Sequence, residues 1–217
     1  MRGAVRLILS ALAIACSASA LQARPVTYPG GKMSMTEVMG DTVLTQLDYT
    51  ISRRVAIGAY GQRESGGERL SAGAVVNYLL MRRNTEVSQA NAYLAVGAGP
   101  SWERQPGRRG RDTDPSGWVA AEADWETRRL FVGGMGQVSV SNDGDVETGF
   151  RTRLGVAPYV ADAGALHTWL FLQVGRAAQD GEDVQVTPVL RLFRGDVLGE
   201  AGVSLNGQAF ATLWFYF

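Results

Sequence analysis

Cysteine and histidine are nearly missing from this chain of 217 residues, which has only Cys16 and His167. Because Cys16 lies in an apolar N-terminal run that we expect to be removed, the exported part has no thiol. This excludes a disulfide scaffold, a cysteine nucleophile and a cysteine-based zinc site. A single histidine also leaves little room for histidine-based metal or catalytic chemistry.

The sequence has no surplus of charge of either sign and no long apolar run. Lys and Arg number 21, and so do Asp and Glu, so no basic surplus indicates a nucleic-acid partner. After the N-terminal run, no stretch of about 18 consecutive apolar residues predicts a transmembrane helix. Yet 46% of the chain is hydrophobic and 27 residues are glycine. Apolar residues that alternate with polar ones are typical of membrane β-barrel strands.

The N-terminus predicts an export signal over residues 1–20. Arg2 and Arg6 form a charged beginning, Leu7 to Cys16 is apolar, and Ala18-Ser19-Ala20 supplies small residues for cleavage. We therefore expect the mature chain to begin at Leu21 and to form one domain, 21–217. A lipoprotein signal ending at Cys16 is the competing interpretation, which Ala13 disfavours.

The last ten residues predict a strand that faces lipid. Every second residue from Ala209 to Phe217 is apolar, which gives a period of two. An exposed aromatic strand invites aggregation in a soluble protein, but a closed barrel pairs it on both sides. Phe215, Tyr216 and Phe217 look like the C-terminal signature that the barrel-assembly machinery reads in bacterial outer-membrane proteins. The alternative is an ordinary buried last strand.

Alternation along the remaining chain predicts about twelve strands between residues 32 and 217, an even number as single-chain bacterial barrels require. Ten strands remain the alternative, if the hairpin over residues 32–50 does not form. We expect a sixth strand over Trp118–Glu126, after a long irregular stretch over Glu103–Ser116, and a polar connection over Arg82–Ser88. Pro158 and Pro188 fall on outward strand positions, and we expect a local bulge at Pro188.

The inward positions of these strands carry polar and charged residues. They are Glu122, Asp124, Glu126, Gln137, Arg151, Arg153, His167, Gln173 and Arg191. One interpretation is an ion-pair network, in which acids and arginines of neighbouring strands face one another and fill a narrow lumen. A second is a small pore with a charged constriction that selects solutes. A third is a membrane hydrolase, which would have to use His167 as its base.

Met33, Met35 and Met39 form a short methionine-rich segment. Thioethers suit Cu(I), but methionines in such a segment more often make apolar contacts. We therefore expect no metal site and no cofactor.

Several stretches resemble a family of small uncharacterised proteobacterial outer-membrane proteins. They are Tyr28–Gly31, Asn77–Leu80, Ser88–Leu94, Ala123–Arg129, Leu166–Leu170 and Val186–Phe193. The resemblance implies a place near copper or silver efflux systems and brings no catalytic residues. The chain departs from the family at Lys32, where an aromatic is usual, and in its low histidine content.

Together these observations predict a closed antiparallel outer-membrane β-barrel that is not an enzyme. Its expected role is structural or accessory in the Gram-negative envelope, with a link to metal tolerance implied by the resemblance. A small solute-specific pore is the alternative, and a secreted soluble β-barrel or sandwich is a further one. The expected partners are outer-membrane lipid, the barrel-assembly machinery and efflux-system components, and no nucleic acid.

Overall fold

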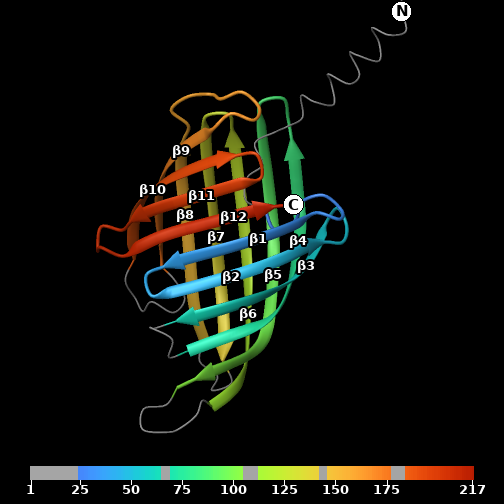
Figure 1. Cartoon of the computed structure of the whole chain (residues 1–217), viewed down its shortest axis with the longest axis vertical. Coiled ribbons are helices and arrows are strands. Elements are labelled where there is room, and N and C mark those ends of the chain that lie inside the picture. The colour runs from blue at the N-terminus through green and yellow to red at the C-terminus, as the bar shows by residue number, and fades with distance from the viewer. Residues whose placement is uncertain (1–23, 65–68, 105–111, 142–145, 177–183) are drawn as a thin grey trace, which may run out of the picture.

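The computed structural model describes residues 24–64, 69–104, 112–141, 146–176 and 184–217, so the expected signal peptide lies outside the described residues. Each strand pairs antiparallel with its sequence neighbours, and β1 pairs with β12 to close a barrel (Figure 1). The strands are β1 (Lys32–Met39), β2 (Thr42–Thr50), β3 (Val55–Glu64), β4 (Arg69–Asn84), β5 (Ser88–Glu103), β6 (Asp112–Thr127), β7 (Leu130–Ser141), β8 (Val146–Val156), β9 (His167–Arg176), β10 (Gln185–Arg194), β11 (Val197–Val203) and β12 (Ala209–Tyr216).

The prediction of a closed twelve-stranded antiparallel barrel is confirmed. The ten-stranded alternative is wrong, because Lys32–Met39 pairs with β2 and β12 along its length. No helix among the described residues is long and apolar enough to cross a membrane.

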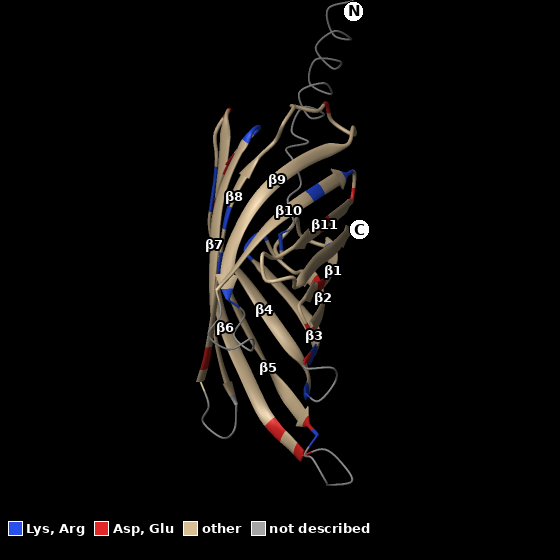
Figure 2. Ribbon diagram, turned by 90° about the vertical axis from the view of Figure 1, so that its left-hand side faces the viewer, with Lys and Arg blue, Asp and Glu red and all other residues tan. Residues whose placement is uncertain are grey.

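The outward face of the barrel is apolar around its whole circumference. Period-two alternation puts side chains such as Leu47, Val76, Val119, Leu172 and Leu213 outside, and each is at least 42% exposed. Soluble monomers rarely leave so large a continuous apolar surface uncovered. In Figure 2 the ribbons are mostly tan, and the blue and red of charged residues occupy short stretches.

Aromatic and charged residues of this outward face lie near the ends of the strands. Tyr49, Tyr78, Trp125 and Phe215 are exposed close to one end of the barrel. The outward charged positions of the described strands lie within two residues of a strand end: Lys32, Arg63, Arg83, Arg176 and Arg194. An apolar band with aromatic rims is what a lipid bilayer requires of a barrel.

The two ends of the barrel differ. At the end that we name the turn end, β2, β4, β6 and β10 lead into the next strand through 51–54, 85–87, 128–129 and 195–196. Lys32 and Phe217 also meet there, where each backbone N–H donates to the other residue's carbonyl. The opposite end, which we name the loop end, holds the Gly40-Asp41 turn and the connection 204–208.

The β5–β6 hairpin is longer than predicted. Both strands have 16 residues, so the expected irregular stretch Glu103–Ser116 is wrong at residues 112–116, and the sixth strand begins at Asp112 rather than Trp118. Pro115, which lies inside the expected irregular stretch, is a strand residue that pairs with Pro100 of β5. Among the described residues, the β6–β7 ladder begins at Ser116, one residue after Pro115.

The expected polar connection Arg82–Ser88 is also wrong, since only residues 85–87 lie between β4 and β5. A bulge between Leu79 and Met81 shifts the register and places Arg82 inward. Its guanidinium donates to Asn91 Oδ1 and to the Tyr93 hydroxyl, both at 2.9 Å. The polar residues of this stretch therefore belong to strands that line the lumen.

The two prolines expected at outward strand positions, Pro158 and Pro188, lie near the end of a ladder. Pro158 is outside β8, which ends at Val156, so the expected outward strand position is wrong. Pro188 pairs with Leu172 in an unbroken β9–β10 register, and the β10–β11 ladder begins one residue later at Val189. The expected bulge at Pro188 is absent. Proline lacks a backbone N–H, and at this position the β10–β11 ladder does not need one, because it begins at Val189.

Candidate functional site

The middle of the lumen holds ion pairs that link β8 to β1 and to β11, and β10 to its neighbour β11. Arg151 of β8 donates to both carboxylate oxygens of Glu37 on β1, at 2.7 and 3.2 Å. Arg153, also on β8, donates to both oxygens of Glu200 on β11, at 3.0 and 3.1 Å. Arg191 of β10 donates to the same Glu200 at 2.6 Å. Buried charges are tolerated when they are paired and hydrogen-bonded in this way.

Aromatic rings support these guanidinium groups. Arg191 lies over the Phe171 ring at 4.5 Å from its centroid, and Arg153 lies over Phe210 at 5.3 Å. Phe171 in turn packs edge-on against Phe131, with ring centroids 5.3 Å apart. Cation–π contacts add to the ion pairs and hold the arginines against the wall. The network is therefore rigid on the β8–β11 side of the lumen.

The acidic residues of β6 do not take part in this network. The register runs from Glu122 through Met135 of β7 to Arg151, so a whole strand separates the acids from the arginines. Among the described residues, Glu122 forms no hydrogen bond and no ion pair, while Asp124 accepts from Asn91 at 2.8 Å. The expectation that the acids of β6 pair with Arg151 and Arg153 is wrong, because those arginines reach across the lumen instead.

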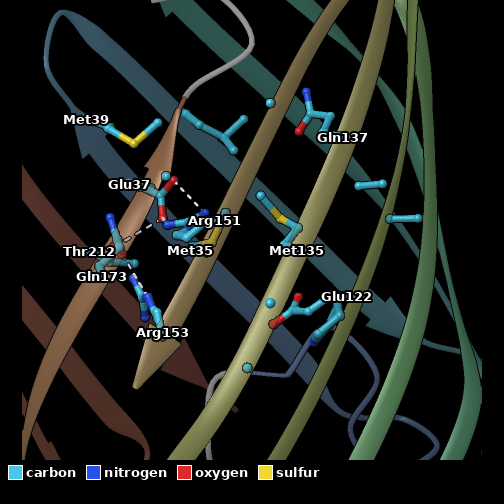
Figure 3. A pocket seen from close by; sticks show the side chains of 18 of the residues that line it. Met35, Glu37, Met39, Glu122, Met135, Gln137, Arg151, Arg153, Gln173 and Thr212 are labelled. Atoms are coloured by element: carbon cyan, nitrogen blue, oxygen red, sulfur yellow. Dashed lines mark hydrogen bonds and ion pairs between the residues drawn. The ribbon is translucent and has the colours of Figure 1, made fainter. Parts of the chain in front are cut away.

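A cavity of about 250 Å³ lies between the two walls. Glu122 and Met135 point into it from one side, and Glu37, Arg151 and Arg153 from the other (Figure 3). Towards the loop end its lining reaches Met39 and Thr42, among other residues. Towards the turn end it is bounded by Pro25, which precedes β1 and belongs to no strand. The cavity is thus large enough for a small solute and has a floor made by the chain's own N-terminal segment.

Residues 24–27, which we name the plug segment, fill the lumen at the turn end. The Arg24 guanidinium donates to Glu126 Oε1 at 2.8 Å and to Gln89 Oε1 at 2.6 Å. The Arg24 backbone N–H donates to the Tyr216 hydroxyl at 2.6 Å. These contacts tie the segment to β5, β6 and β12 at once.

The rest of the plug segment is anchored by apolar and polar contacts. Val26 is fully buried and packs with Ala56, Leu79 and Tyr93. Arg82 donates to the Val26 carbonyl at 2.9 Å, and the hydroxyls of Thr27 and Thr50 are 3.1 Å apart. Every residue of the segment except Pro25 therefore has a specific partner on the barrel wall.

The other predicted lumen residues occupy inward positions with distinct surroundings. Gln173 accepts from Arg153 Nε at 2.8 Å and Gln137 donates to Ser139 at 3.2 Å. His167 lies near the turn end, with its ring 5.6 Å from that of Phe193. In the described part of the chain no hydrogen bond links His167 to a serine or threonine hydroxyl. His167 is therefore a half-buried residue of the barrel wall.

Sequence reasoning missed four residues that organise the lumen: Arg24, Glu37, Arg82 and Glu200. Glu37 and Glu200 lie at inward positions of β1 and β11, so alternation could have found them. Arg24 lies before the first strand, where no period exists, and Arg82 lies beyond a bulge. Met33 and Met35, weighed as Cu(I) ligands, are buried together with Tyr216.

Comparisons with known proteins give a likeness of fold only. No protein-family model matches the chain, and no curated protein matches it by sequence. The solved structures include a KdgM porin in complex with disordered oligogalacturonate, with 9% identity, 86% of this chain and 98% of that chain covered, and a TM-score of 0.44. They also include OccK11 (OpdR) of Pseudomonas aeruginosa, with 10% identity, 86% and 65% covered, and a TM-score of 0.42. Likenesses this weak say nothing about what this chain binds.

Proposed function

We propose that the chain is a β-barrel of the bacterial outer membrane, with a structural or accessory role in the envelope, and that its lumen does not conduct in the described conformation. The continuous apolar outward face supports the membrane location, since only lipid can cover such a surface on every strand. The aromatic positions near the turn end fit the boundary between lipid and water.

The position of the plug segment is the main support for a closed lumen. It fills the turn end with a buried ion pair and a fully buried valine. Above it, the Arg151–Glu37 pair crosses the cavity from β8 to β1. A solute would have to displace the plug segment and pass beside this pair.

The test combines location and conductance. Cells that express the full chain are fractionated, and the purified barrel is run on SDS gels with and without boiling. We expect outer-membrane enrichment, a heat-dependent mobility shift, and no steady current from the refolded mature chain in planar bilayers. A soluble, unshifted protein would contradict the membrane location, and steady ohmic steps would contradict the closed lumen.

A small solute-specific pore is the second candidate. It is favoured by the cavity of about 250 Å³ and by Glu122, which faces it without an ion pair among the described residues. A cavity lined by a carboxylate that has no ion-pair partner is typical of a selective constriction. Ohmic steps from the unaltered chain would support this candidate over the closed barrel.

Two partners are proposed on sequence grounds. Recognition of Phe215 and Phe217 by the barrel-assembly machinery predicts that removal of Phe217 lowers assembly in cells while refolding in detergent is unchanged. A role beside copper or silver efflux rests on the family resemblance alone. It predicts greater copper or silver sensitivity in cells that lack the protein, and equal sensitivity would remove the proposal.

A further inference from the structure

The turn end of the lumen holds a cation-binding site that the chain fills with its own side chain. The site consists of the Glu126 carboxylate and the Gln89 carbonyl oxygen, which both accept from the Arg24 guanidinium, while the Tyr216 hydroxyl accepts from the Arg24 backbone N–H beside it. Glu126 is 5% exposed, and its second oxygen has no hydrogen-bond partner. A buried carboxylate with spare acceptor capacity strongly favours a cation beside it.

This site is the last of three acidic positions in a row along β6. Glu122, Asp124 and Glu126 face inward at every second residue, so the Cα atoms of neighbouring members of the row are about 7 Å apart along the strand. Glu122 lines the cavity and Glu126 meets the plug segment. The row therefore runs from the cavity to the closed mouth.

The arginines of the opposite wall form their ion pairs with other carboxylates. Arg151 is held by Glu37, and Arg153 and Arg191 are held by Glu200. Among the described residues, Asp48, Glu122 and Asp124 have no ion-pair partner within 4.0 Å. Once Arg24 leaves, Glu126 joins them. In the middle and turn-end parts of the lumen the inward carboxylates then outnumber the inward arginines: Glu37, Asp48, Glu122, Asp124, Glu126 and Glu200 against Arg82, Arg151, Arg153 and Arg191. A narrow passage with such an excess favours cations over anions.

We propose that residues 24–27 are a tethered plug, and that the lumen behind it is a path for small organic cations of the guanidinium or alkylammonium class. Arg24 occupies the final site of that path, so a passing cation competes with the chain's own guanidinium for Glu126. The inference rests on the proposed outer-membrane barrel and adds a regulated opening and a class of solute to it.

The chemistry of the site fits this class. A guanidinium or ammonium group donates several hydrogen bonds and accepts none, which matches the acceptor oxygens of Glu126 and Gln89. The cavity of about 250 Å³ above the plug admits a small molecule and not a polymer coil.

The first experiment displaces the plug segment by electrostatic repulsion. In Arg24→Glu the new carboxylate faces Glu126 and Asp124, and like charges in a buried site repel. We expect the refolded variant to conduct in planar bilayers, with an open fraction at least about tenfold above that of the unaltered chain. A KCl gradient should give a reversal potential of the sign that cation selectivity produces. Arg53→Glu is the matched control, because it makes the same charge change on an exposed turn at the same end of the barrel.

A disulfide lock tests whether movement of the plug is the cause. The mature chain has no cysteine, and the Thr27 and Thr50 hydroxyls are 3.1 Å apart. Thr27→Cys/Thr50→Cys combined with Arg24→Glu should be silent when oxidised and should conduct after reduction. The single variant Thr27→Cys with Arg24→Glu should conduct in both conditions.

The solute class is tested on the open barrel. Glu122→Gln in the Arg24→Glu background should lower the cation selectivity, and millimolar guanidinium chloride should reduce the K⁺ current by occupying the carboxylate row. Arg24→Gln replaces Arg24→Glu if charge reversal prevents refolding.

The outcomes separate the inference from the proposed function. A folded, heat-modifiable Arg24→Glu barrel that stays silent overturns the plug, and an open one that prefers anions overturns the cation path. A chain that neither enters the outer membrane nor shifts on heating removes the proposed function itself.

Discussion

Arg151 on β8 and Glu37 on β1 bind each other across the lumen through two hydrogen bonds of 2.7 and 3.2 Å. The two strands lie on opposite sides of the closed sheet, separated by β9 to β12 in one direction and by β2 to β7 in the other. The pair therefore braces the barrel wall. Neither side chain is more than 19% exposed. Removal of either one therefore leaves the other charge buried without its partner.

This brace predicts a strong difference between single and double substitutions. Glu37→Ala leaves the Arg151 guanidinium buried without its partner and should cost about 3 kcal/mol in the free energy of unfolding. Glu37→Met/Arg151→Met should recover most of that loss, because no charge remains in the site. Urea unfolding in detergent micelles measures both values, and equal losses in the two variants would show that the charges are not coupled.

The same amide substitution should destabilise the barrel strongly at Glu200 and hardly at all at Glu122. Glu200 accepts from Arg153 and Arg191, so Glu200→Gln should destabilise the barrel by about 3 kcal/mol. Glu122 has no ion pair among the described residues, so Glu122→Gln should change stability by less than about 0.5 kcal/mol. Parallel unfolding curves test the contrast, and a large loss in Glu122→Gln would reveal a partner for that residue.

Several inward glycines make room for aromatic rings, and Gly155 is one beside a ring that supports an arginine. A Cβ there would lie 2.4 Å from the Phe171 ring, which supports the Arg191 guanidinium. Gly155→Ala should therefore cost about 1–3 kcal/mol by overpacking. Gly136→Ala is the control on a neighbouring strand, since a Cβ there meets nothing within 4 Å. Similar thermal midpoints for the two variants would contradict the close packing.

The outward face can be tested with one arginine. Leu172→Arg places a charge in the middle of β9 on the apolar surface and should cost about 2–4 kcal/mol in lipid. Val87→Arg, in a turn where Val87 is 74% exposed, should leave stability unchanged. Refolding yields into lipid vesicles give the comparison. If Leu172→Arg were equally harmless, this face would not contact lipid.

Alternation predicted the strands because period two is a local property of each segment. The errors lie where a bulge or a proline interrupts that pattern. Arg82 is polar because it serves the lumen beyond a bulge, and Pro100 and Pro115 are strand residues despite lacking an N–H. Local sequence cannot distinguish these positions from loops.

The partners within the lumen could be predicted only in part. Inward positions followed from alternation, but the stagger of the strands and the width of the barrel decide which inward residues meet. Arg151 therefore reaches Glu37, 114 residues away, and not an acid on β6. The plug segment was not predicted at all, because its contacts with Glu126 and Tyr216 span 102 and 192 residues and the segment has no periodicity.

The bond from the Arg24 N–H to the Tyr216 hydroxyl joins the two ends of the folded chain at the seam between β1 and β12. Tyr216 reaches its place only when β12, the last strand in sequence, has docked onto β1. The contacts of Arg24 are therefore incomplete until β1 and β12 have paired and the barrel is closed. Closure of the barrel and seating of the plug segment therefore depend on the same strand pairing. A barrel that has closed can hold its plug segment from the moment of closure.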